Sequence, residues 1–410
     1  MRGAPIPATM RAMRLAAPAP AAEAPLRFVE LPVPEPGPGK VLLRVLACGV
    51  CRTDLHILEG ELPPHRSPIV PGHQIVGEVV ALGAGAELVA PGGEPAAPPL
   101  AVGDRVGVPW LHQTDETCRF CRRGDENLCE HATFTGWDVD GGFAEYTVAP
   151  AGFVYRLPAG MTAMAAAPLL CAGIIGYRCL RLIGVVGDAA GLPGLRHPSR
   201  SPSSLAAGLA SPSDGLAAVD EPGRWPDWPE GANGDAAAPV VDRPRRLGIY
   251  GFGSAASLCT QIAIWRGWEV YGIARDEEHR AMARELGAVW AGESGDDPGV
   301  LYDAAIVFAP AGELAVDALR RLDKGGIVAL GGIYSSPIPP IEYPWIYHER
   351  VIRSVANSTR QDARELLRDA AVIPVVSRVQ EYDLEQANEA LLDLKEDRVR
   401  GSAVLRVTGD

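Results

Sequence analysis

Short apolar runs interrupted by glycine and proline make up the chain up to about residue 154. Residues 26–30 alternate apolar and polar side chains, a stretch rich in Pro and Gly follows over 32–39, and 41–46 is the next apolar run. Comparable runs lie at 75–82, 104–108 and 143–148. Strand-length segments separated by turn residues predict a small β-rich unit and not a series of strand–helix repeats.

From residue 247 onward the pattern changes to alternating strands and helices. The predicted strands are 247–250, 270–273, 304–308 and 326–330, and helical spacing of apolar residues covers 254–265, 277–286 and 313–322. Apolar strands that alternate with helices predict a doubly wound parallel sheet. The fold class is therefore α/β, with one β-rich unit and one parallel-sheet unit.

The segment between these units, residues 188–245, is rich in Pro, Gly, Ala, Ser and Asp and has no apolar periodicity. Such a composition buries too little apolar surface to offset the entropy of the chain, so we expect a disordered surface insertion. A docking loop that uses Trp225 and Trp228 is the alternative. Residues 91–100 predict a shorter insertion of the same kind.

Composition narrows the classes of function. The 410 residues suggest two domains, and 47% hydrophobic against 22% charged residues allows a sizeable core. A net charge of −13 argues against nucleic-acid partners. No apolar run approaches the ~18 residues of a membrane span, so we expect no membrane association. Because no secretory signal is visible, we expect a cytoplasmic protein with reduced cysteines.

Three residues far apart in the chain supply a ligand set for a catalytic metal. Cys51 lies in the run CGVCRTDLH, His73 in PGHQ and Cys171 in PLLCAG. Each alone is more often a buried core residue. Together they offer the two thiolates and one imidazole of a catalytic zinc site that leaves a fourth position open. Such an ion lowers the pKa of a bound alcohol or polarises an aldehyde.

A second cluster is local in sequence. Cys118 and Cys121 form a Cys-x-x-Cys pair, and Cys129 follows in a loop that contains glycine. Asp115 lies three residues before Cys118 and could be the fourth ligand of a structural zinc ion. The alternatives are that Asp115 is a solvated acid, or that His112 or His131 fills the site.

The run Gly251-Phe252-Gly253-Ser254-Ala255-Ala256 follows an apolar strand and opens a helix, which is typical of a dinucleotide-binding turn. Gly251 and Gly253 would permit the turn and the close approach of the pyrophosphate, and Ala256 the helix–strand contact. After the next strand, Ala274 and Arg275 replace the acid typical of an NAD site. Arg275 could pair with a 2′-phosphate, which favours NADP(H) over NAD(H). Alternatively, Arg275 points to solvent and Asp276 binds the ribose hydroxyls.

With these three clusters in this order, the chain resembles the zinc-dependent alcohol dehydrogenases of the medium-chain dehydrogenase/reductase superfamily. The resemblance covers about residues 11–182 and 246–407. It implies a GroES-like catalytic domain (11–182, resumed at 356–410), the insertion (188–245), and a Rossmann cofactor-binding domain (246–355). It further implies a zinc-dependent oxidoreductase that transfers a hydride between NAD(P)(H) and a primary alcohol or aldehyde. We also expect a homo-oligomer.

The resemblance assigns roles to the residues around Cys51. Asp54 would orient the zinc-bound His73, because a ligating imidazole donates its other N–H to such a group. Thr53 would take the proton of the alcohol and His56 would pass it to solvent. Arg52 would contact the cofactor pyrophosphate. By family position Leu58 and Trp110 would line the substrate pocket, with Trp137 nearby.

Two residues depart from the family pattern. Gln74 follows His73 where the family usually has Glu, so ligand exchange at the metal could differ. Asp115 stands where the family usually has a fourth cysteine, which puts the structural ion in question. Two other functions compete: a zinc-free quinone reductase of the same fold, and a non-catalytic NADP-binding protein. The retention of Cys51, His73 and Cys171, and of Thr53 and His56, argues against them.

Overall fold

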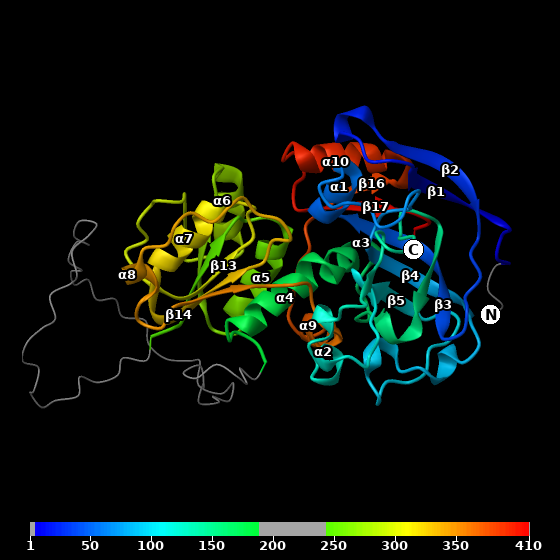
Figure 1. Ribbon diagram of the computed structural model, residues 1–410, viewed down its shortest axis with the longest axis horizontal. Coiled ribbons are helices and arrows are strands. Elements are labelled where there is room, and N and C mark those ends of the chain that lie inside the picture. Colours follow the sequence, from blue (N-terminus) through cyan, green and yellow to red (C-terminus); the bar gives the residue numbers. More distant parts are fainter. Residues whose placement is uncertain (1–4, 188–242, 410) are drawn as a thin grey trace, which may run out of the picture.

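The computed structural model describes residues 5–187 and 243–409, so the predicted insertion lies almost wholly outside the described residues. The described chain forms two lobes side by side (Figure 1). One lobe contains a seven-stranded, mainly antiparallel sheet, and the other a six-stranded sheet in which all neighbouring strands are parallel. The predicted fold class, α/β with one β-rich unit and one parallel-sheet unit, is confirmed.

The first lobe is built on the sheet β16-β17-β3-β4-β5-β9, with β8 paired to β3. Strand β17, near the C-terminus, pairs antiparallel with β3, so the end of the chain returns to the first lobe. The first lobe contains the strands β1 (Thr9–Leu15), β2 (Leu26–Pro32), β3 (Lys40–Val50), β4 (Gln74–Leu82), β5 (Arg105–Val108), β6 (Leu111–Gln113), β7 (Thr133–Phe134), β8 (Tyr146–Pro150), β9 (Tyr155–Arg156), β16 (Val379–Asp383) and β17 (Ser402–Arg406). Its helices are α1 (Arg52–Glu59), α2 (Arg119–Arg122), α3 (Ala163–Ala166) and α10 (Ala387–Lys395).

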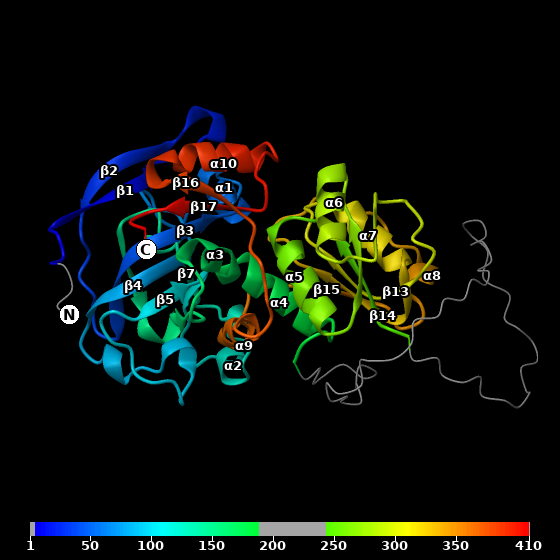
Figure 2. The same cartoon turned by 180° about the vertical axis from the view of Figure 1, so that it is seen from behind.

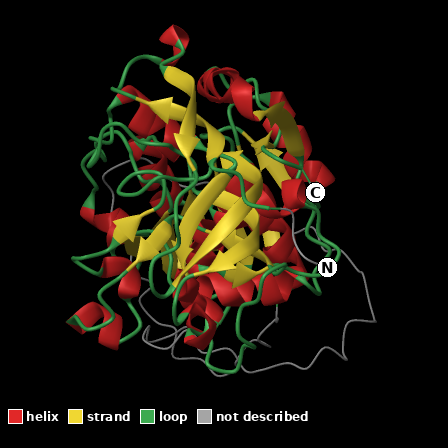
Figure 3. Cartoon of the chain, turned by 90° about the vertical axis from the view of Figure 1, so that its right-hand side faces the viewer, coloured by secondary structure: helices red, strands yellow, loops and turns green. Residues whose placement is uncertain are grey.

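The second lobe has the strand order β12-β11-β10-β13-β14-β15, with α5 packed on one face of the sheet and α7 on the other. Numbered along the chain this order is 3-2-1-4-5-6, that of dinucleotide-binding domains. Its elements are β10 (Arg246–Tyr250), α5 (Ser254–Trp265), β11 (Glu269–Ile273), α6 (Glu277–Glu285), β12 (Trp290–Gly292), β13 (Tyr302–Val307), α7 (Gly312–Arg320), β14 (Leu322–Leu330), α8 (Tyr343–Ile346) and β15 (Val351–Ser354). Figure 3 views the chain from the side of the first lobe, whose strands lie in front.

Helices α4 (Ala172–Leu182) and α9 (Arg360–Ala370) lie at the junction of the lobes (Figure 2). The buried face of α4, with Tyr177 and Leu180, belongs to the same apolar cluster as Ile262 of α5. Asp362 of α9 is fully buried and pairs with Arg181 of α4 at 2.6 Å. Apolar burial and this ion pair therefore fix α4, whose N-terminus carries Cys171, against both lobes.

The predicted disorder of residues 91–100 is wrong. Pro91 is buried and Leu100 is 2% exposed. Arg364 donates to the carbonyl oxygen of Gly92, and Arg156 donates to those of Pro98 and Pro99 at 2.7 Å each. The segment is ordered although it lacks apolar periodicity, because arginines from other elements satisfy its backbone carbonyl groups. Composition alone does not reveal those partners.

Among the described helices, none alone is long and apolar enough to cross a membrane. Residues 163–170 and 172–182 satisfy the length and composition test only as a pair bent by 44°. Because α4 is packed into the protein core, this pair is accounted for by burial in the protein.

Candidate metal centre and cofactor site

The structure brings together Cys51, His73 and Cys171 from three separate elements. Cys51 is the N-cap of α1, His73 directly precedes β4, and Cys171 directly precedes α4. The Nε2 atom of His73 lies 3.3 Å from the Sγ atom of each cysteine, and the two Sγ atoms are 4.0 Å apart. Ligands at ordinary Zn–S and Zn–N distances in a tetrahedron lie about 3.6–3.8 Å apart, so the donor set fits a zinc ion.

Asp54 forms hydrogen bonds that hold His73 and the backbone of Cys51 in place. Its side chain is fully buried, and its Oδ1 atom accepts hydrogen bonds from His73 Nδ1 at 3.1 Å and from the backbone of Gly72 at 3.2 Å. Its Oδ2 atom accepts from the backbone N–H of Cys51 at 3.0 Å. With Nδ1 engaged, Nε2 is the nitrogen that faces the two sulfurs.

Burial and mutual contacts shift the pKa values of these groups. The hydrogen bond to Cys171, followed by burial, raises the pKa of Cys51 well above its usual value. Burial lowers the pKa of His73, but the charges of Asp54 and Cys51 outweigh it and raise this pKa to about 10. A cation that binds here must therefore displace protons.

Thr53 and His56 lie on α1 just beyond Cys51. The backbone N–H of Thr53 donates to Cys51 Sγ at 3.4 Å, which places this residue next to the cluster. His56 Nδ1 is 2.5 Å from Glu61 Oε2, and the His56 ring lies 5.8 Å from the ring of Tyr334 in the second lobe. His56 thus faces the junction between the lobes.

An aromatic cluster adjoins His73. The Trp110 ring meets the His73 ring edge-on at 4.8 Å between centroids, and stacks with Phe134 at 5.2 Å and with Trp137 at 5.8 Å. Trp137 and Phe134 are only partly buried. Leu58, expected in the same pocket, is instead 0% exposed in the core of the first lobe, so it presents no surface to a ligand.

Gln74, the residue that departs from the family pattern, is 3% exposed and lies opposite Gly49 across β3 and β4. A Cβ atom on Gly49 would come within 2.8 Å of the Gln74 amide. The side chain is therefore packed close over the backbone of β3, beside the metal cluster.

A second group of possible ligands consists of Asp115, Cys118, Cys121 and Cys129, whose ligand atoms lie within 4.8 Å of one another. His112 and His131 do not belong to it. Asp115 Oδ1 accepts from the backbone N–H groups of Thr117 and Cys118 at 2.9 Å each, and these bonds lower the pKa of the carboxyl. The Cys121 backbone N–H lowers the pKa of Cys118. Both effects favour the charged forms that bind metal.

Arg360, at the start of α9, anchors the segment that carries this second ligand group to the rest of the protein. Its Nε atom donates to Glu126 at 2.8 Å, its Nη1 atom to Glu116 at 2.7 Å, and its backbone N–H also reaches Glu126 at 2.7 Å. Glu126 is 7% exposed. Sequence reasoning missed this arginine, because its partners lie more than 230 residues away.

The predicted dinucleotide turn joins β10 to α5. Gly251 has φ +84°, and a Cβ atom there would lie 2.7 Å from the backbone nitrogen of Ala309. A Cβ on Gly253 would meet no atom within 4 Å, so open space adjoins this residue. Ala256 is fully buried under the sheet. The turn thus has the close packing on one side and the open approach on the other that a dinucleotide requires.

The sequence does not show the surroundings of Arg275, which follows β11, or of Arg52, which begins α1. The Arg275 side chain is 94% exposed, and its partner is Asp397 at 3.7 Å and not the adjacent Asp276. Asp276 caps α6 by accepting from the backbone of His279 at 2.9 Å, and also pairs with the His279 ring. Arg52 pairs with the same Asp397 at 2.5 Å.

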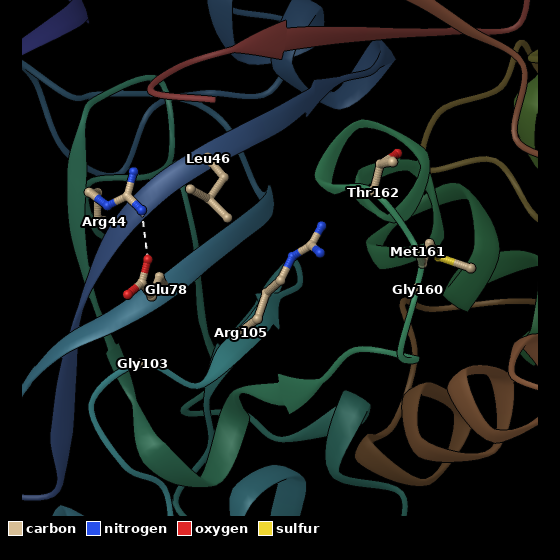
Figure 4. A pocket seen from close by; sticks show the side chains of 8 residues that line it. All are labelled: Arg44, Leu46, Glu78, Gly103, Arg105, Gly160, Met161 and Thr162. Carbon is tan, nitrogen blue, oxygen red and sulfur yellow. Dashed lines mark hydrogen bonds and ion pairs between the residues drawn. The ribbon is translucent and has the colours of Figure 1, made fainter. Parts of the chain in front are cut away.

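A separate hollow lies on the face of the large sheet between β3, β4, β5 and the start of α3 (Figure 4). Arg44 and Glu78 form an ion pair at one side of it at 2.6 Å, and Arg105 extends into it. None of its lining residues belongs to either ligand cluster. This hollow is therefore separate from the candidate active site, which is the cluster of Cys51, His73 and Cys171.

Comparisons with known proteins identify the class. The alcohol dehydrogenase GroES-like domain matches residues 37–159. A protein described as "Probable alcohol dehydrogenase AdhA" from Mycobacterium tuberculosis is 41% identical over 401 residues, covering 98% of each chain. An alcohol dehydrogenase of Geobacillus stearothermophilus is 28% identical, covering 94% of this chain and 96% of its own. A cinnamyl alcohol dehydrogenase structure from Sorghum bicolor shares the fold, with TM-score 0.74, 23% identity and 97% coverage of both chains.

The family model and the full-length relative define an oxidoreductase of the medium-chain dehydrogenase/reductase superfamily. Within it, the chain belongs to the alcohol dehydrogenase family, since the full-length identity of 41% extends over both lobes.

Proposed function

We propose that this chain is a zinc-dependent enzyme that transfers a hydride between NAD(P)(H) and a primary alcohol or aldehyde. The observation that carries the proposal is the convergence of Cys51, His73 and Cys171, whose ligand atoms lie within 4.0 Å of one another, while the buried carboxylate of Asp54 holds the His73 ring. A structural role alone would not require an incomplete ligand set of three, which leaves one position for substrate oxygen.

In this proposal zinc, when bound, supplies a Lewis acid at the open position. Cys51, His73 and Cys171 hold it, and Asp54 fixes the orientation of the His73 ring. The hydroxyl of Thr53, whose backbone N–H donates to Cys51, would take the proton from the alcohol. His56 passes that proton to solvent, with its ring held by Glu61 at 2.5 Å.

The cofactor would bind between the lobes, with its pyrophosphate at Gly251, Gly253 and the N-terminus of α5. Arg52 would contact the pyrophosphate, and Arg275 would face the adenosine ribose. We propose NADP(H) in preference to NAD(H). The capping role of Asp276 supports this choice, because His279 already binds both of its oxygens, which leaves the carboxylate less available to the ribose hydroxyls.

Asp115, Cys118, Cys121 and Cys129 would hold a second, structural zinc ion. The closed set of four ligand groups supports this assignment, since structural sites leave no open position. The carboxylate in place of a fourth thiolate would weaken the site relative to four cysteines.

The rings of Trp110, Trp137 and Phe134 gather beside His73, and Trp137 and Phe134 are partly exposed, which supports an apolar substrate pocket.

A second copy of the chain is proposed to dock on the second lobe. There β15 is the edge strand of the sheet, and Val351 and Tyr343 expose 36% and 64% of their surfaces. Light scattering on a Val351→Lys variant, with loss of the dimer expected, tests that assembly.

A panel of aldehydes with NADPH and NADH, read at the cofactor absorbance and combined with metal analysis, tests the main proposal. We expect reduction that disappears with the removal of zinc. Activity on quinones that survives chelation would instead support a zinc-free quinone reductase, and cofactor binding without turnover would support a non-catalytic protein.

A further inference from the structure

Asp397 joins one arginine from each lobe. Its Oδ1 atom lies 2.5 Å from Arg52 Nη2 in the first lobe, and its Oδ2 atom lies 3.7 Å from Arg275 Nη2 in the second. Arg52 opens α1 immediately after Cys51, and Arg275 follows the end of β11. One carboxylate thus pairs with both arginines that the proposed function assigns to the cofactor.

The loop that carries Asp397 is fixed beside the second lobe. Three residues after Asp397, Arg400 Nε pairs with Glu278 of α6 at 2.6 Å. Further along the chain, the Ser402 hydroxyl lies 2.6 Å from that of Ser254, the first residue of α5. Asp397 itself has φ +53°, which few residues other than Gly, Asn and Asp adopt readily. These contacts hold the loop of Asp397 beside α5 and α6 of the second lobe.

We propose that Asp397 limits the preference of this enzyme for NADP(H), by weakening the binding of NADP(H) more than that of NAD(H). The inference rests on the proposed cofactor site, in which Arg275 faces the ribose. A 2′-phosphate adds nearly two negative charges at that position, whereas a 2′-hydroxyl adds none. The Asp397 carboxylate repels the phosphate and also competes for the Arg275 guanidinium, so its cost falls on NADP(H).

The other acids near Arg275 are engaged elsewhere. Asp276 bonds to His279, Glu277 pairs with Arg280 and Arg284, and Glu293 pairs with Arg280. Arg280 also donates to the carbonyl oxygen of Arg275 at 2.8 Å, which holds the backbone of the turn. Asp397 is therefore the carboxylate whose removal changes the charge facing Arg275.

Isothermal titration of NADPH, NADH, 2′,5′-ADP and 5′-AMP onto the wild-type holoenzyme and an Asp397→Asn variant tests the proposal. Asparagine suits the positive φ and keeps the shape, so only the charge is lost. We expect the ratio of NADH to NADPH dissociation constants to rise about threefold or more at low salt, as ion pairs at exposed positions allow. The shift should recur with the two fragments and shrink in high salt.

Glu396→Gln is the matched control, because it removes the neighbouring charge, which pairs with Arg398 and with neither Arg52 nor Arg275. It should leave the ratio unchanged. In an Arg275→Ala background, Asp397→Asn should have a smaller effect, because the competition for Arg275 is gone. If Asp397→Asn fails to fold, Asp397→Gly, which also accepts the positive φ, should give the same shift.

Wild-type-like ratios in a folded Asp397 variant would overturn the inference while leaving the proposed function intact. An equal shift with Glu396→Gln would also overturn it, because the effect would then be one of general charge. Failure of wild type to bind either dinucleotide would overturn the proposed function itself.

Discussion

The Nδ1 atom of His73 lies 3.1 Å from Oδ1 of Asp54, and neither side chain has exposed surface. A buried carboxylate that also accepts from the backbone of Cys51 links the imidazole and one thiol in a single rigid unit. This unit explains why the ligand set is preorganised, since a rotated His73 ring would leave the Asp54 charge buried and unpaired.

Asp54→Asn should therefore weaken zinc retention. The amide keeps the shape but loses the charge that orients and strengthens the imidazole, so we expect a loss of affinity of about 10- to 100-fold. Zinc content after graded competition with a chelator measures it. Asp104→Asn, which removes a carboxylate paired with Arg156 in the same lobe, should retain zinc as the wild type does. Equal retention in both variants would contradict the role assigned to Asp54.

Asp115→Ala should lower the zinc content toward one ion per chain and reduce thermal stability, with little direct effect on hydride transfer. Because Asp115 also shapes its turn, Asp115→Asn separates the two roles: it keeps an acceptor for Thr117 and Cys118 but removes the charged ligand. Asp115→Cys should hold the ion more tightly. Two zinc ions per chain at an unchanged melting temperature in Asp115→Ala would show that this carboxylate is not a ligand.

Arg360→Gln should destabilise the fold, because it leaves the nearly buried Glu126 without its ion pair. We expect a loss of about 3 kcal/mol in unfolding free energy, the usual cost of breaking a buried pair. Arg368→Gln, on the same helix, removes an exposed pair with Glu94 and should change the stability little. Denaturant unfolding of the two variants compares them, and equal losses would count against a special role for Arg360.

His112 should make the stability depend on pH. Burial, followed by the charge of Lys40, lowers its pKa to about 4. Because this value lies below that of the unfolded chain, about 6.5, the unfolded state takes up the proton first. The contribution is present above about pH 6.5 and is lost as the pH falls toward 4, at most about 3 kcal/mol. His112→Gln should flatten the stability curve over this window, whereas curves that stay parallel would contradict the assignment.

The sequence predicted most of the fold because its signals are local. The helix over 254–265 and the strands around 247–250 and 270–273 follow from apolar periodicity, and the structure has them within one or two residues. Residues 91–100 were missed because arginines from other elements order them. The fate of Leu58 was missed because family position does not show which face of α1 is buried.

In the candidate site, the residues of both ligand clusters could be predicted from the sequence, but the charge that acts on Arg275 from a distant part of the chain could not. The alternative in which Asp276 binds the ribose hydroxyls came from its place in the sequence, yet its side chain caps α6. The carboxylate that faces Arg275 is Asp397, more than a hundred residues further along the chain. No local pattern marks such a residue, because its effect depends on how the end of the chain returns beside β11. The roles of Thr53, His56 and Arg52 stay predictions.

The most direct test of the central claim is zinc content and aldehyde reduction measured together on wild type and Cys171→Ala. We predict that the variant keeps its fold by circular dichroism, loses one zinc ion per chain and has no measurable turnover, because a thiolate of the open site is gone. Wild type stripped of the same ion should recover activity when zinc is restored. Full activity in a Cys171→Ala protein that lacks the metal would contradict the account.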